Sequence, residues 1–158
     1  GLHVWSPLPA GTIGYRSGPI MASSDIWEAE IKGKGGHSSR PHEAKDPTIA
    51  AANIIMSVQT IISRELDPLE TAVLSIGRLE SGSAPNIIPD KAFIQGSIRT
   101  TNSKVRDGLP EKIERIAKGI GSALRCEVET NYIHVYPVTV NDPNMIETLK
   151  EVWGQIFG

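Results

Sequence analysis

Four histidines are the side chains best suited to bind a metal ion or move a proton at neutral pH: His3, His37, His42 and His134. None of them lies in an HExxH or His-x-His pair, and the sequence has no CxxC pair, no GxSxG elbow and no phosphate-binding loop. A catalytic metal site needs several converging ligands and a general base. Spacing alone therefore indicates an α+β domain with one unusual glycine-histidine segment.

That segment, Gly-Lys-Gly-Gly-His-Ser-Ser-Arg-Pro-His at 33–42, is predicted to be a loop, because three glycines and a proline favour neither helix nor strand. Two glycines directly before His37 would let the backbone approach a neighbouring group closely. A second loop is predicted at 81–90, where Asn86 lies between Pro85 and Pro89. A rigid loop of this kind can present a polar side chain.

Alternating and helical apolar patterns predict the elements that position these loops. Strands are expected at 25–32, 71–79, 92–100 and 126–135. One helix is expected from Asp46 to about Arg64, and a second begins after a Ser103 cap. The order strand, helix, strand, strand, helix, strand is typical of the ferredoxin-like βαββαβ fold. The predicted fold class is α+β, a two-layer sandwich whose four-stranded antiparallel sheet has the order 4-1-3-2 and two helices on one face.

The composition narrows the class of protein. The chain has 158 residues, 39% of them hydrophobic, and a net charge of −2, which suits one globular domain and argues against a nucleic-acid partner. No apolar run approaches the roughly 20 residues of a membrane span, and the N-terminus does not resemble a signal peptide. Cys126 is the only cysteine, so a disulfide framework is excluded and a cytoplasmic location is expected.

The segment 33–42 resembles the Gly-Lys-Gly-Gly-His-x-x-x-Pro-His loop of the dizinc amidohydrolases, which include aminoacylases and glutamate carboxypeptidases. Four further stretches agree with this family in the same order along the chain: 1–5 (Gly-Leu-His-Val-Trp), 14–23, 83–89 (Ser-Ala-Pro-Asn-Ile-Ile-Pro) and 96–100 (Gly-Ser-Ile-Arg-Thr). Within the family the pattern is most similar to the hippurate hydrolase and auxin-conjugate amidohydrolase branch. The resemblance implies a parent enzyme that hydrolyses the amide bond of N-acyl amino acids.

The resemblance also implies the domain organisation. Residues 23–138 would be the dimerisation and lid domain, flanked by catalytic-domain segments at 1–22 and 139–158. The abrupt start of the chain and an apolar helix near its end agree with this interpretation. The implied cofactor is a divalent metal, zinc first and manganese or cobalt as alternatives, whose bound water attacks the carbonyl while a carboxylate outside this chain takes the proton. Only His3 resembles a metal ligand, so the chain alone is expected to hold no cofactor and to be inactive.

Three further site residues follow from the resemblance. His37 would reach the active site of the neighbouring subunit and donate a hydrogen bond to the developing oxyanion. Asn86 would bind the substrate or its amide oxygen, and Arg99 would bind the substrate carboxylate through its guanidinium fork. The simpler interpretations are that His37 stabilises a turn and that Arg99 forms an ordinary surface ion pair. His42 and His134 are interpreted as structural.

The expected partner is a second copy of the chain. The edge strand 71–79, from Thr71 to Leu79, would pair with its symmetry mate beside the helix that begins at Asp46. Charged substitutions at Leu74 or Ile76 would then break the dimer. Two alternatives remain open: a ferredoxin-like regulatory module that binds a small ligand, and a self-contained small metalloenzyme that uses His37 and His42 as ligands. An amino-acid ligand on the isolated domain would favour the first, and intrinsic hydrolysis the second.

Overall fold

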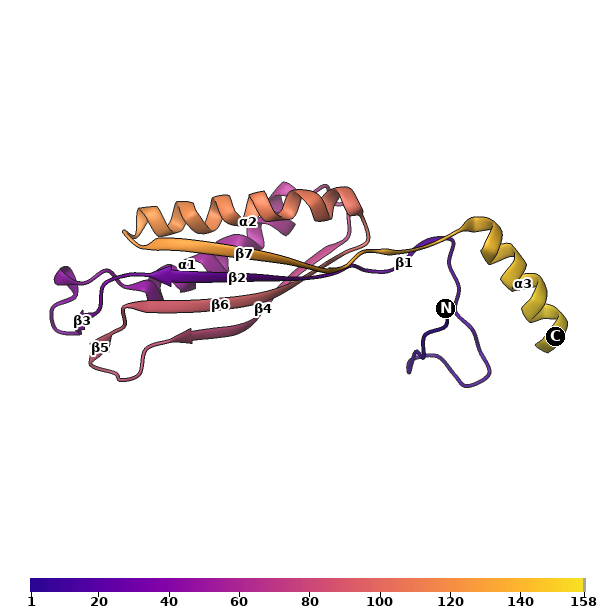
Figure 1. Cartoon of the computed structure of the whole chain (residues 1–158), viewed down its shortest axis with the longest axis horizontal. Helices are drawn as coiled ribbons and strands as arrows, with labels where there is room; N and C mark the ends of the chain where they lie inside the picture. Colours follow the sequence, from indigo (N-terminus) through magenta and orange to yellow (C-terminus); the bar gives the residue numbers. More distant parts are fainter. Residues whose placement is uncertain (158) are drawn as a thin grey trace.

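The computed structural model describes residues 1–157 and contains a four-stranded antiparallel sheet covered on one face by two helices (Figure 1). The elements follow one another as β2 (Ser24–Lys32), α1 (Pro47–Thr60), β4 (Ala72–Ser81), β6 (Lys91–Thr100), α2 (Ser103–Ala123) and β7 (Glu127–Tyr136). The sheet order is β4-β6-β2-β7, which leaves β4 and β7 at the edges. The predicted βαββαβ fold and its strand order are therefore confirmed.

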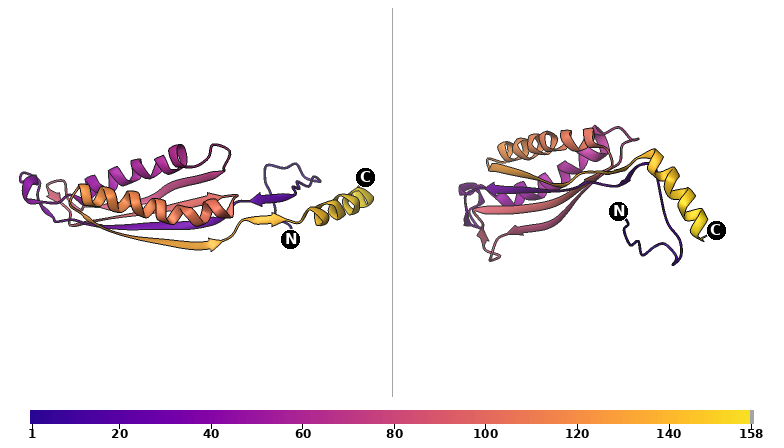
Figure 2. Two further views of the ribbon diagram at one scale, coloured as in Figure 1. Left: turned by 90° about the horizontal axis from the view of Figure 1, so that it is seen from above. Right: turned by 45° about the vertical axis from the view of Figure 1, so that its right-hand side comes forward.

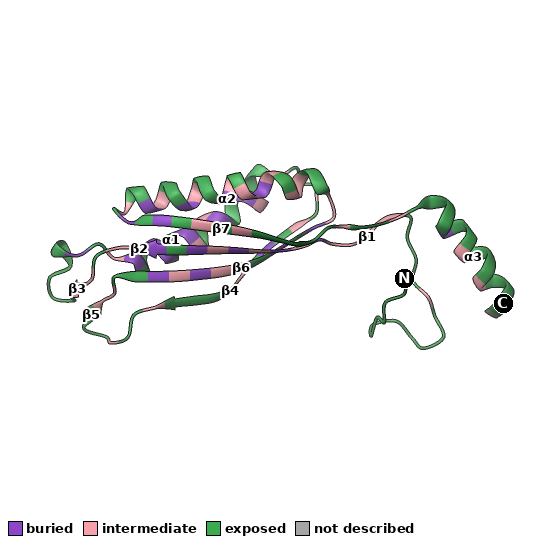
Figure 3. Ribbon diagram, in the orientation of Figure 1, coloured by how far each residue is buried: buried purple, intermediate pink, exposed green. Residues whose placement is uncertain are grey.

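The core lies between the sheet and the helices, as the band of buried residues in Figure 3 shows. Every other residue of β2 is buried there: Trp27, Ala29 and Ile31. Their neighbours on β6 and on the two helices complete the same layer: Ile94, Ile98, Ile54, Val58, Leu109 and Ile113. The period of two on the strands and of about 3.6 on the helices is what brings these side chains to one side of each element.

The two helices begin at side-chain caps. Asp46 accepts hydrogen bonds from the backbone N–H groups of Thr48 (2.8 Å) and Ile49 (3.4 Å), as the sequence predicted. The cap of α2 is Asn102 rather than the predicted Ser103. Asn102 has extended backbone angles and its Oδ1 accepts from the N–H of Lys104 at 2.8 Å, whereas Ser103 is already helical. A π-helical turn, η2 (Ile61–Glu65), follows α1.

A narrow extension leads away from the sheet. The strand β1 (Gly18–Met21) pairs with β8 (Thr139–Asn141), and the helix α3 (Pro143–Phe157) follows. Figures 1 and 2 show that both chain ends lie on this side, which we call the base, at the opposite end of the molecule from the short strands β3 (Gly36–His37) and β5 (Ile87–Ile88). The final residue of the expected segment 139–158 lies outside the described residues. No helix of the described part is long and apolar enough to cross a membrane.

Candidate functional site at the tip and the base of the domain

The end of the sheet far from the base, which we call the tip, brings together two segments that the sequence analysis treated as separate loops. A two-residue strand, β3 (Gly36–His37), pairs antiparallel with β5 (Ile87–Ile88). The N–H of Ser38 donates to the backbone oxygen of Asn86 at 3.0 Å, which extends the pairing by one step. His37 is paired with Ile87, and Asn86 lies opposite Ser38, so both exposed residues lie at the tip one position apart in the pairing.

The glycines before His37 are explained by backbone contacts within the chain. A Cβ at Gly33 would lie 2.2 Å from the carbonyl oxygen of Lys45, and a Cβ at Gly35 would lie 2.9 Å from that of Ile88. Any other residue would have to push the loop away from its neighbours. Of the two glycines directly before His37, Gly35 makes the predicted close approach, to the end of β5 (Ile88); Gly33 makes a further one, to Lys45 just before α1.

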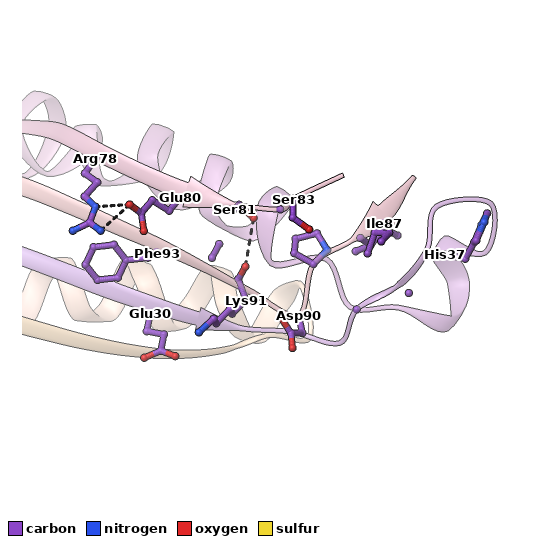
Figure 4. Close-up of a pocket in the computed structure, with 16 residues that line it drawn as sticks. Glu30, His37, Arg78, Glu80, Ser81, Ser83, Ile87, Asp90, Lys91 and Phe93 are labelled. Atoms are coloured by element: carbon purple, nitrogen blue, oxygen red, sulfur yellow. Dashed lines mark hydrogen bonds and ion pairs between the residues drawn. The ribbon is translucent and has the colours of Figure 1, made fainter. Parts of the chain in front are cut away.

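The tip forms one end of an open groove of about 1120 Å³ beside β4 and β6. Its wall includes Arg78, Glu80 and Phe93: the Arg78 guanidinium bonds Glu80 at 2.7 Å and lies over the Phe93 ring. Figure 4 shows His37 at the far end of this groove from the Arg78–Glu80 pair. The His37 ring is hydrogen-bonded at Nδ1 to the hydroxyl of Ser39, at 2.8 Å.

Arg99 lies at the other end of β6, close to the base. Its Nη1 donates to the hydroxyl oxygen of Tyr136 at 3.3 Å, and both side chains are exposed. Because β6 separates the tip from Arg99 by about eight residues of extended strand, His37 and Arg99 are on the order of 25 Å apart. The structure thus places His37 and Asn86 at the same end of the molecule but does not bring Arg99 to them.

His3 lies in the N-terminal segment at the base. Its Nδ1 is 2.5 Å from the Val4 backbone oxygen, and its ring meets that of Trp5 edge to face. No group of three or more His, Cys, Asp or Glu side chains that could hold a metal ion occurs among residues 1–157. A catalytic ion needs several converging ligands, and the single imidazole of His3 does not meet that need.

A buried polar cluster at the base end of the sheet was missed by the sequence analysis, which treated Asp25 only as the start of a strand. Asp25 is fully buried and receives three charge-assisted hydrogen bonds from Arg106, at 2.6, 2.9 and 3.2 Å. The hydroxyl of Tyr132 and the N–H of Val135 also donate to it. Burial opposes the charge of Asp25, but the Arg106 hydrogen bonds and charge outweigh it and hold the pKa of the carboxyl below its usual value.

His134 lies beside the same cluster, with its Nδ1 3.5 Å from a carboxylate oxygen of Asp25. This position fits the interpretation of His134 as a structural residue. Burial, together with the nearby Asp25 charge, raises the pKa of the Tyr132 phenol. A signal was present in the sequence, since an aspartate on the apolar face of a strand requires a buried partner. The partner itself, 81 residues away along the chain, could not be identified without the fold.

The fold and the exposed tip define a class of protein: a two-layer α+β domain with polar groups at its far end and a second polar site at its base. Residues 23–123 match the M20 peptidase dimerisation domain, and the chain belongs to that family. This match confirms the family resemblance found in the sequence. As its name states, a domain of this family serves dimerisation.

Individual relatives cover nearly the whole chain. Hippurate hydrolase of Campylobacter jejuni is 41% identical over 157 residues, which are 98% of this chain and 41% of that protein. IAA-amino acid hydrolase ILR1-like 4 of Arabidopsis thaliana is 37% identical over 162 residues, covering 100% of this chain and 37% of that protein. The crystal structure of YXEP from Bacillus subtilis, a dinuclear metal binding peptidase of the M20 family, matches with a TM-score of 0.77 and 33% identity over 98% of this chain and 37% of its own.

Proposed function

We propose that this chain is the dimerisation and substrate-capping domain of a homodimeric metal-dependent amidohydrolase that cleaves the amide bond of N-acyl amino acids. Membership of the dimerisation-domain family supports the role of the domain. The substrate class is supported by relatives that are named for hippurate and IAA-amino acid hydrolysis. The chain spans only 37–41% of the length of these relatives, so the parent's activity is assigned here by likeness.

The observation that carries the proposal is the separation of the two candidate sites. His37 and Asn86 lie at the tip, whereas Arg99 and Tyr136 lie near the base. An N-acyl amino acid is much shorter than the roughly 25 Å between them, a length set by the rise of the extended strand. One substrate can contact both groups only if the tip of one subunit and the base of another meet around it. A symmetric dimer would build two such composite sites.

Within a composite site each group has a chemical task that matches its side chain. Arg99 presents a planar fork of N–H donors that suits the carboxylate of the amino-acid part. His37 and Asn86, carried in from the other subunit, supply N–H donors for the amide oxygen as it gains negative charge. Closing the tip over the site would also exclude water, which strengthens each of these hydrogen bonds.

The surface that supports pairing is the free edge of β4 with the adjoining face of α1. β4 is the last strand on its side of the sheet, and it presents Val73 and Leu79, each about half exposed. On α1, Ile49 and Met56 are 53% and 73% exposed. An edge strand with unpaired backbone groups beside an apolar helix face is a typical site for two copies to join.

We propose a metal ion only because of the relatives, one of which is a dinuclear metal binding peptidase. His3 is the one residue of this chain that we assign to it. The remaining ligands and the general base are assigned to parts of the parent protein outside residues 1–158.

Complementation between two inactive variants tests the composite site. The parent enzyme would be made as a heterodimer of one His37→Ala subunit and one Arg99→Ala subunit, purified through two different tags. Each homodimer variant should be nearly inactive. The heterodimer contains one intact site, built from the Arg99 of one subunit and the His37 of the other, and should recover about half of the wild-type activity by symmetry. If the heterodimer were as inactive as the two homodimer variants, His37 and Arg99 would act within one subunit, and the proposal would fail.

A further inference from the structure

The side of the His37 ring that faces its own loop is occupied by a single residue. Nδ1 accepts a hydrogen bond from the backbone N–H of Ser39 at 3.2 Å. The Ser39 hydroxyl lies 2.8 Å from the same nitrogen. The loop around this contact is fixed as well, because the N–H of Arg40 donates to the His37 backbone oxygen at 2.8 Å and Ser38 is tied to Asn86.

These two contacts determine where the ring proton lies. A backbone N–H can only donate, so Nδ1 must offer its lone pair and carries no proton in the neutral ring. The Ser39 hydroxyl is then also a donor to Nδ1, and the imidazole proton is on Nε2. Nε2 is the nitrogen on the opposite side of the ring from the loop, and the ring is exposed at the tip. The only N–H of the neutral ring is therefore the one that Ser39 does not contact, on an exposed residue.

We propose that Ser39 is a positioning residue: its hydroxyl and N–H hold His37 as the Nε2–H tautomer with that proton directed out of the tip, toward the substrate oxygen of the opposite subunit. The inference deepens the proposed function and rests on it, since it names the residue that orients the oxyanion donor. Hydrogen bonds in series also polarise one another, so the bond to Nδ1 modulates the strength of Nε2–H as a donor.

The two hydrogen bonds of Ser39 can be separated by mutation. Ser39→Ala removes the hydroxyl but keeps the backbone N–H, and Ser39→Thr keeps both groups. Ser38→Ala is the matched control, because it removes a neighbouring exposed hydroxyl and leaves both His37 hydrogen bonds in place. In the intact enzyme Ser39→Ala should lower kcat by about five- to tenfold, the loss expected for one orienting hydrogen bond, with KM changed less than about twofold. Ser39→Thr should restore kcat, and Ser38→Ala should match the wild type.

A double-mutant cycle distinguishes a positioning role from a general effect on the loop. If Ser39 acts through His37, Ser39→Ala should cost nothing further in a His37→Ala background. A loss of the same size in both backgrounds, or a Ser39→Ala enzyme with wild-type kcat, would overturn the inference. Failure of the proposed function has a different signature, since His37→Ala itself would then keep full kcat.

The tautomer can be measured on this chain without any activity. Two-bond ¹⁵N–¹H correlation spectra show which ring nitrogen carries the proton, and His37→Ala identifies the signals. In spectra of the neutral ring, His37 should be protonated at Nε2 and unprotonated at Nδ1. A proton on Nδ1 would contradict the geometry. The inference would then be wrong regardless of the kinetic results.

Discussion

Arg99 and Tyr136 lie on strands that are not neighbours, and Arg99 nevertheless donates a hydrogen bond to the Tyr136 hydroxyl oxygen at 3.3 Å. Between them runs β2, whose Ser24 is the residue opposite Tyr136 in the sheet. Because the Tyr136 oxygen accepts from Arg99, its own proton can be donated to a bound ligand. A guanidinium and a phenol O–H on one face of a sheet form a site suited to a carboxylate.

This pair predicts an altered titration of Tyr136. The hydrogen bond from Arg99, followed by that from Ser24, stabilises the phenolate and lowers the pKa of Tyr136 below its usual value. Arg99→Met removes both the donor and the positive charge, so the pKa should rise toward the ordinary value of about 10. Ultraviolet titration of the phenolate would measure the change, with Tyr136→Phe used to identify the signal. An unchanged titration in Arg99→Met would show that the hydrogen bond does not persist in solution.

Arg99→Lys tests the carboxylate-binding role in the intact enzyme. Lysine keeps the charge but loses the planar fork, so substrate binding should weaken more than the chemical step. KM should rise by about tenfold or more, while kcat falls by less than about threefold. Arg115→Lys, which changes an exposed arginine of α2 that is paired with Glu65, is the control. Equal KM values for the wild type and Arg99→Lys would rule out the role.

The proposed dimer surface is tested by introducing charge where the structure exposes apolar side chains. Leu74, which the sequence suggested as a target, is only 6% exposed and packs in the core, so a charge there would unfold the domain. Val73 and Met56, at 52% and 73% exposure, are suitable instead. Val73→Glu with Met56→Glu brings like charges together at a twofold interface and should weaken the dimer at least about tenfold.

Sedimentation equilibrium of the intact protein would measure this change, and circular dichroism would check that the variant is folded. Met145→Glu is the control, because Met145 is 65% exposed on α3, away from β4 and α1. A double variant that dimerises as tightly as the wild type would place the interface elsewhere.

The sequence predicted those parts of the structure that repeat a local pattern. The alternation of Trp27, Ala29 and Ile31 and the Asp46 cap are confirmed in the structure. The pairing of β3 with β5 was not predicted, because two residues on each side show no period and lie about fifty positions apart. The cap at Asn102 differed by one residue because asparagine and serine are both good caps, and only backbone angles distinguish them.

For the site, the sequence could identify candidates but not their neighbours. Family likeness singled out His37, Asn86, Arg99 and His3, and their roles remain predictions. The partners that give these residues their geometry, Ser39 beside His37 and Tyr136 beside Arg99, have no motif of their own. Sequence spacing also could not show that His37 lies beyond one end of the four-stranded sheet while Arg99 lies near its other end. The composite site follows from this relationship.

The Asp25–Arg106 pair predicts a specific dependence of stability on pH. The side chain of Asp25 is fully buried and that of Arg106 is 13% exposed, so removing either charge leaves the other without a partner in the interior. Asp25→Asn keeps the shape of the side chain and should lower the free energy of unfolding at neutral pH by about 3–5 kcal/mol. Glu80→Gln, which breaks the exposed pair with Arg78, should cost less than about 1 kcal/mol and serves as control.

The effect of Asp25→Asn should disappear in acid. Because the folded pKa of Asp25 lies below its unfolded value of about 3.9, the pair contributes its full stability above that pH. As the pH falls from about 4 through the folded pKa, the carboxyl takes up a proton and the contribution is lost. Urea unfolding at a series of pH values should therefore show the wild type and Asp25→Asn converging below about pH 4. A gap that stays constant into strong acid would mean that the loss in Asp25→Asn comes from altered packing and not from the charge.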